Sequence, residues 1–142
     1  MKSTGKLLIG ALALGLALPA AAATITRSAL PQPRTENGIA YMSGGIGETE
    51  AAAMKEEAKH YSLSMVFSAD KDNEYLADIR VTIKDKAGKE VLNTVSDGPI
   101  MLVKLPAGKY RVAADAKGKT LHRTVRVSAT GERQLNFHWP HA

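Results

Sequence analysis

The 142-residue chain contains no cysteine, one tryptophan and two phenylalanines. Without thiols it can form neither a disulfide nor a thiolate metal site, and it offers no cysteine nucleophile. Its few aromatic residues do not alternate with a basic stripe, so we expect no nucleic-acid partner. Its apolar runs are shorter than the ~20 residues of a membrane-spanning helix, and we therefore expect no stable membrane anchor.

Residues 1–23 have the organisation of a secretory signal peptide. Lys2 and Lys6 precede an apolar run from residue 7 to residue 18, and the alanines that end at Ala23 fit the rule for cleavage. We expect cleavage after Ala23 and export to the periplasm, a compartment that suits an exported chain without disulfides. Two of the 19 basic residues and none of the 14 acidic residues lie in this leader, so its removal lowers the formal net charge from +5 to +3.

The part of the chain that follows the leader divides into three segments. Residues 24–46 contain prolines and glycines and show little periodicity, so we expect an extended N-terminal arm. Residues 47–60 are rich in alanine, glutamate and lysine, which favour helix, and Met54 shares one face with Ala51 and Ala58. Residues 61–139 are expected to form a β-sandwich domain.

From Tyr61 onward the apolar residues recur with a period of two. Ile79, Val81 and Ile83, for example, alternate with charged and hydroxyl residues, which is typical of a half-buried strand. Turn residues separate seven such segments. They are 61–69, 75–84, 89–95, 99–105, 108–115, 119–128 and 133–139. The pattern predicts a mainly β fold, a seven-stranded antiparallel β-sandwich preceded by one short α-helix.

Three motifs in this region resemble those of a known domain. They are VTIKDKAG at 81–88, Gly98-Pro99, and LPAGKYRV at 105–112. Together they resemble the carboxypeptidase regulatory-like, or transthyretin-like, β-sandwich, and in particular small exported proteins of Gram-negative bacteria that carry this domain. The resemblance covers residues 41–139. It implies an accessory module, and it implies no catalytic residues.

The stretch from Ser43 to Glu50 (SGGIGETE) places glycines in front of the predicted helix, where phosphate groups often bind. It lacks the third glycine of a dinucleotide fingerprint and the lysine of a Walker loop. Glu48 and Glu50 also put negative charge at the helix N-terminus. We expect a bend in the chain here, and no cofactor.

Two segments carry potential metal ligands. His138 and His141 lie near the C-terminus at a spacing that suits neither a helical nor a strand pair of ligands. The loop from Asp70 to Glu74 has oxygen ligands at alternate positions, as calcium loops do, but it lacks the glycine and distal glutamate of an EF-hand. We assign no metal site, and leave weak metal binding open.

No catalytic constellation is evident in the sequence. Ser43-Gly44-Gly45 does not match the G-x-S-x-G nucleophile elbow. Glu56 and Glu57 are expected on an exposed helix face, where a paired-carboxylate mechanism has no cleft to work in. We therefore expect a protein that is not an enzyme, and we assign no catalytic residue.

Two functional hypotheses remain. The first is an accessory binding module that holds another envelope protein through sandwich loops or an edge strand. An acidic partner would suit the basic excess of the C-terminal half, to which seven residues contribute: Lys104, Lys109, Arg111, Lys117, Lys119, Arg123 and Arg126. The alternative is a protein that binds a sugar or a metal ion at the loops 70–74 and 96–99. The tyrosines and Trp139 are all expected in the core, which weakens the sugar hypothesis.

Overall fold

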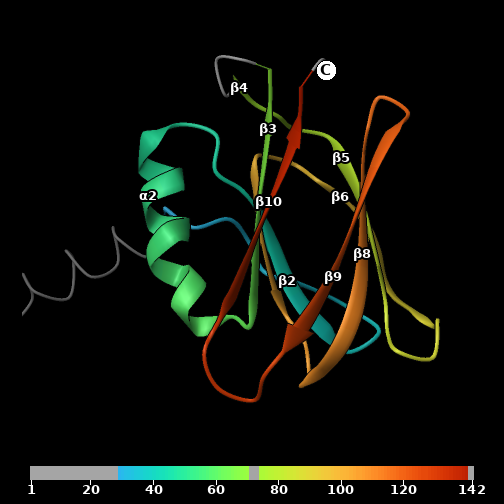
Figure 1. The fold of residues 1–142 in the computed structure, drawn as a ribbon. Helices are drawn as coiled ribbons and strands as arrows, with labels where there is room; N and C mark the ends of the chain where they lie inside the picture. Colours follow the sequence, from blue (N-terminus) through green and yellow to red (C-terminus); the bar gives the residue numbers. More distant parts are fainter. Residues whose placement is uncertain (1–28, 71–73, 141–142) are drawn as a thin grey trace, which may run out of the picture. The chain divides into compact units, whose positions relative to one another are not determined.

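The computed structural model describes residues 29–70 and 74–140. The predicted signal peptide lies outside these residues. The chain divides into two units, Met1–Leu30 and Pro31–Ala142, and the elements below all belong to the second. Within the described ranges, ten strands form two sheets that face each other across an apolar core (Figure 1).

Sheet A has six strands, in the order β1, β2, β7, β3 and β10, with the short β4 paired to the far end of β3. Their bounds are β1 (Arg34–Glu36), β2 (Ile39–Gly44), β3 (Leu63–Ala69), β4 (Glu74–Tyr75), β7 (Ile100–Lys104) and β10 (Arg133–Trp139). Sheet B has four strands in the order β6, β5, β8 and β9. Their bounds are β5 (Ile79–Lys84), β6 (Glu90–Ser96), β8 (Gly108–Ala116) and β9 (Lys119–Val127).

The core between the sheets follows from the alternation of apolar residues. Ile79, Val81 and Ile83 are buried on β5, and their neighbours in the sequence face away from the core. Phe67 on β3 packs against Phe137 on β10, with the ring centroids 5.8 Å apart. Trp139 joins this group, and its indole Nε1 donates a hydrogen bond of 2.9 Å to the carbonyl of Lys119. The aromatic group therefore links the last strand of sheet A to sheet B.

The predicted helix at 47–60 is present as α2 (Glu48–Glu57) and the 3₁₀ turn η2 (Ala58–His60). Figure 1 shows α2 on the side of sheet A that faces away from sheet B. Met54 is fully buried beneath the helix, in a region where Ile100 and Leu102 of β7 are also buried. None of the helices in the described ranges is long and apolar enough to span a bilayer.

The prediction of seven strands is wrong because two strands arise where an arm was expected. Strands β1 and β2 lie within the segment 24–46, so sheet A begins before residue 61. Strand β2 is covered on both faces, by the core at Tyr41 and beneath α2 at Met42, and it therefore shows no alternation. Asn37 and Gly38, at φ 52° and 77°, form the hairpin turn before it.

Two further details differ from the predicted sandwich. The segment 75–84 is divided, because Asp78 adopts φ 57° and separates β4 from β5, and Ala77 before it is exposed. Strand β10 pairs with β3 in parallel, so the sheets are not purely antiparallel. The other predicted strands agree with the observed ones to within two residues at each end.

Candidate functional site

The outer face of sheet B is open, and it is the most strongly charged sheet surface in the described chain. Apart from Ala113 and Asp115, the outward positions of β5, β8 and β9 hold lysine, arginine, threonine and histidine side chains, and most of them are exposed. Four of these cations define what we call the cationic face: Lys84, Lys109, Arg111 and Arg126.

The register of the sheet places these cations opposite one another. Lys84 on β5 pairs with Arg111 on β8, and Lys109 on β8 pairs with Arg126 on β9. Side chains at such positions begin only ~5 Å apart, and like charges placed directly opposite destabilise a sheet. Within the described ranges the ion pairs are Arg34–Asp97 and Lys59–Glu56, so neither involves the cationic face.

The acidic residues nearby do not neutralise this cluster. Glu90 of β6 lies opposite Lys84 across a β-bulge, but no ion pair joins them. Farther along the same face the charges are balanced, because Arg80 lies opposite Asp115. The pairs of like charge on the outer face therefore lie at one end of sheet B.

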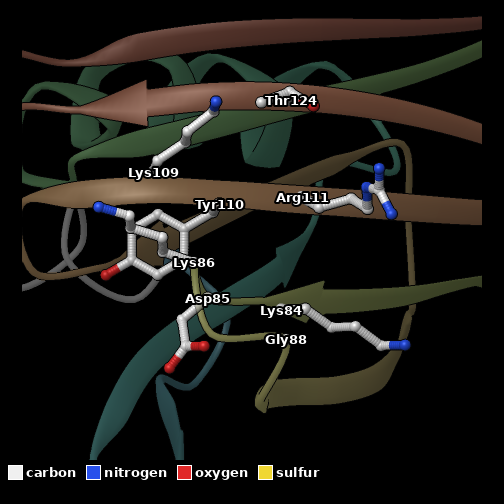
Figure 2. A pocket seen from close by; sticks show the side chains of 8 residues that line it. All are labelled: Lys84, Asp85, Lys86, Gly88, Lys109, Tyr110, Arg111 and Thr124. Atoms are coloured by element: carbon white, nitrogen blue, oxygen red, sulfur yellow. The ribbon is translucent and has the colours of Figure 1, made fainter.

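A hollow of about 370 Å³ lies at this end. Figure 2 shows its lining side chains: Lys84, Asp85, Lys86, Gly88, Lys109, Tyr110, Arg111 and Thr124. In that view the side chains of Lys84 and Arg111 extend in the same direction from neighbouring strands. Four of the eight lining residues are cations and one is an acid, which suits an anionic ligand.

The one acidic residue of the hollow, Asp85, accepts hydrogen bonds from the backbone of the turn that follows it. Its Oδ1 accepts hydrogen bonds from the backbone N–H groups of Ala87 and Lys89, at 2.9 and 3.0 Å. Burial raises the pKa of the neighbouring Tyr110 hydroxyl, and the negative charge of Asp85 adds to this rise. That hydroxyl donates a hydrogen bond of 2.7 Å to the carbonyl of Pro106. Both side chains thus serve to fix the rim of the hollow.

A second hollow of about 290 Å³ adjoins the first, and Arg111 and Thr124 line both. Its other lining residues are His122 and Arg123 of β9. The Arg123 guanidinium lies 5.3 Å from the centroid of the Phe137 ring and donates a hydrogen bond to the carbonyl of His122. The second hollow thus brings His122 near Arg111, whereas the Arg123 guanidinium lies over Phe137, an aromatic ring of the core.

The glycine-rich stretch at Ser43–Glu50 forms the turn between β2 and α2. The N–H of Gly45 donates to Oε1 of Glu50 at 2.7 Å, so a carboxylate of the chain itself occupies this donor. Gly45 and Gly47 adopt φ 95° and 89°, which favours glycine. Gly98 packs so closely that a Cβ added there would overlap the Gly44 backbone. This geometry agrees with the expected bend.

The histidine and aspartate candidates are only partly described. Nδ1 of His138 lies 3.1 Å from Oγ of Ser68, and His141 lies outside the described residues, as does the 71–73 part of the Asp70–Glu74 loop. In the part of the chain that the structure covers, no group of three or more potential ligands is placed to hold a metal ion. Weak metal binding at these two segments stays a hypothesis.

The other side chains considered as catalytic or binding residues form hydrogen bonds or ion pairs within the fold. Ser43 is buried, and its Oγ accepts the N–H of Asp97 at 3.0 Å. Glu56 forms its ion pair with Lys59. In the loop 96–99, the Ser96 hydroxyl donates to the carbonyl of Gly98 at 2.7 Å.

The aromatic residues are mostly where they were expected. Tyr41, Tyr61, Tyr110 and Trp139 are buried, as predicted. The prediction is wrong for Tyr75, which exposes 65% of its surface. The sugar hypothesis thus regains one exposed aromatic side chain.

The sequence located only part of the cationic face. Of the seven basic residues singled out, Lys109, Arg111 and Arg126 belong to it, whereas Lys104 lies 5.3 Å from the Tyr61 ring centroid at the other sheet. Lys84 was missed. It lies within the VTIKDKAG motif, at an outward position of its strand, but its pairing with Arg111 depends on the register between β5 and β8.

The chain matches a known protein family. Residues 62–138 match the family described as the Rhizobiales growth-associated tandem repeat domain. The matched segment runs from the start of β3 nearly to the end of β10, and it includes the whole cationic face. No curated protein matches the chain.

Proposed function

Because the matched residues make up more than half of the chain, the protein belongs to the Rhizobiales growth-associated tandem repeat domain family, and we propose that it is a non-enzymatic binding module of the cell envelope. In this proposal the cationic face holds an acidic partner. The module acts by binding alone, with no chemical step and no cofactor.

One observation carries this proposal: two pairs of like charges lie directly opposite each other on an open sheet face. Each such pair costs stability, on the order of 0.2–1 kcal/mol. An anionic partner would offset this repulsion, and the cations would in turn speed up its association.

The location of the protein is part of the proposal. The predicted leader at 1–23 and the absence of cysteine from the sequence support export to the periplasm. The description of the family as growth-associated agrees with a role in the envelope, which must be extended as a cell grows.

The likeness to the carboxypeptidase regulatory-like sandwich also belongs to the proposal. Support comes from the two-sheet architecture and from the positions of the motifs. The stretch 81–88 forms most of β5 and its turn, and 105–112 forms the turn and the first half of β8. A sandwich of this type would be an accessory module, as proposed here.

A carbohydrate ligand is the alternative, and it is favoured by Tyr75. This exposed side chain lines a hollow of about 500 Å³ with Gly45, Ala51 and Ala52. An aromatic ring of this kind can stack on a sugar ring. If neutral sugars bind there, Tyr75→Ala will abolish their binding. The sheet B variant described next, Lys84→Glu/Arg111→Glu, will leave it unchanged, because neither residue lines this hollow.

The main proposal is tested by the salt concentration needed to elute the protein from a dextran sulfate column. Lys84→Glu/Arg111→Glu should elute at lower salt than the wild type. The matched control, Lys55→Glu in α2 with Lys59→Glu in η2, makes the same change in net charge away from sheet B. Equal shifts for the two double variants would show that net charge alone governs binding, and would contradict the proposal.

A further inference from the structure

The arrangement of the cationic face also indicates the chemical class of its partner. We infer that the partner is an anionic polysaccharide, with carboxylate or phosphate groups that occupy the two adjacent hollows on sheet B. This inference rests on the proposed function, because it assumes that the cationic face is the binding surface.

The spacing of the cations suits a chain with repeated charges. Neighbouring strands lie about 4.8 Å apart, and two residues along a strand span about 6.8 Å. The pair Lys84–Arg111 is therefore one such step along β8 from the pair Lys109–Arg126. The four charges follow a diagonal across β5, β8 and β9. A polymer with an anionic group on each unit can meet several of them at once, whereas a single small anion cannot.

Arg111 is the central residue of this arrangement because it lines both hollows. Its planar guanidinium can donate two parallel hydrogen bonds to a carboxylate or a phosphate. The hydroxyl of Thr124, which also lines both hollows, can donate to or accept from a sugar hydroxyl. The site therefore offers contacts to the neutral groups of a polysaccharide as well as to its charges.

The same face lacks the features of a protein or membrane contact. In protein interfaces a few anchors dominate, with tryptophan and tyrosine prominent beside arginine, and peripheral membrane binding depends on apolar side chains that enter the lipid. In the described ranges the exposed large hydrophobic residues are Ile46 and Tyr75, and neither lies on sheet B. A hydrated polymer bound through its charges needs no such anchor.

The inference is tested by titrating the full chain, at fixed salt, with polygalacturonate, a phosphomannan, monomeric galacturonate, poly-L-glutamate and phosphatidylglycerol vesicles. We expect one or both of the anionic polysaccharides to bind at least ~10-fold more tightly than the monomer and poly-L-glutamate. The two polysaccharides distinguish carboxylate from phosphate. The Lys84→Glu/Arg111→Glu variant should lose at least ~10-fold in this affinity, and Lys55→Glu/Lys59→Glu should change it by less than ~2-fold.

Two results would overturn the inference in distinguishable ways. If poly-L-glutamate or the vesicles bind as tightly as the polysaccharides, and the sheet B variant still loses this binding, the partner class is wrong and the proposed function stands. If the sheet B variant and the helix control behave alike with every probe, the proposed function fails as well. Melting temperatures of both variants show whether a loss of binding reflects unfolding. Lys84→Glu/Arg111→Glu again places like charges opposite each other and adds a carboxylate opposite Glu90, so it should lower the Tm only slightly.

Discussion

Sheet A and sheet B face solvent in different ways, although both contribute to the same core. The outer face of sheet A carries Met42, Ile100 and Leu102, and all three are buried on the side where α2 packs. The corresponding face of sheet B carries lysine, arginine and threonine side chains, and most are exposed. The difference indicates that sheet A contributes stability on both of its faces. In sheet B the outer face is available for binding.

The largest effect that this comparison predicts is on stability. Leu102→Ala removes a fully buried side chain beneath α2 and should lower the free energy of unfolding by ~2–5 kcal/mol. Thr82→Ala changes an outward position of β5 and should stay within ~0.5 kcal/mol of the wild type. Urea denaturation of both variants measures the difference. Similar losses would show that the outer face of sheet B also stabilises the fold.

A second effect concerns the connection between the sheets. Gly98 lies between β6 and β7, and the Cβ of an alanine there would overlap the Gly44 backbone at the end of β2. Gly98→Ala should therefore cost ~1–3 kcal/mol, as overpacking does. Gly88→Ala is a control in a turn with open space, although its φ of 86° adds strain of its own. Thermal unfolding should give Gly98→Ala the lower Tm of the two.

A third and smaller effect separates stability from binding. Arg126→Glu puts a negative charge opposite Lys109, so it should stabilise the sheet by ~0.2–1 kcal/mol while weakening the binding of polyanions. A control at Lys55, Lys55→Glu, carries the same change in charge on α2 and should leave polyanion binding nearly unchanged. The Tm and the salt needed for elution from dextran sulfate measure the two quantities. A variant that lost both stability and binding would contradict the assignment of this face to function.

The smallest effect depends on pH, at the balanced end of sheet B. The Thr120 hydroxyl donates a hydrogen bond of 2.7 Å to Asp115 and, with the N–H of Gly118, holds the pKa of that carboxyl below its ordinary value. A lowered pKa means that the contribution of Asp115 is present above its ordinary pKa of 3.8 and is lost as the pH falls through the lowered value. Thr120→Val removes the larger of these two causes. The Tm of this variant should therefore fall less than that of the wild type as the solution is acidified below pH 3.8. If the Tm of the variant and the Tm of the wild type fell equally with pH, this account would be contradicted.

The sequence predicted the strands that have one face in the core and the other face in solvent. Strands β8 and β10 and the second half of β9 alternate between core and solvent, and the bounds of all three were placed within a residue. Strand β2 was missed because it is buried on both faces. The cationic face could be predicted only in part, since strand register determines that Lys84 lies opposite Arg111. Register depends on contacts between distant segments, and a pattern along one strand does not contain it.

The parallel pairing of β10 with β3 has a consequence for the timing of folding. Phe137 and Trp139, at the end of the described chain, pack against Phe67 in the middle of it. Contacts between such distant segments form late, after the loop between them has closed. On the proposed export route, a polypeptide that crosses the inner membrane unfolded cannot complete this aromatic group until residue 139 has emerged. Assembly of the sandwich must then follow translocation, and chaperones of the receiving compartment would meet a chain whose apolar strands are still uncovered.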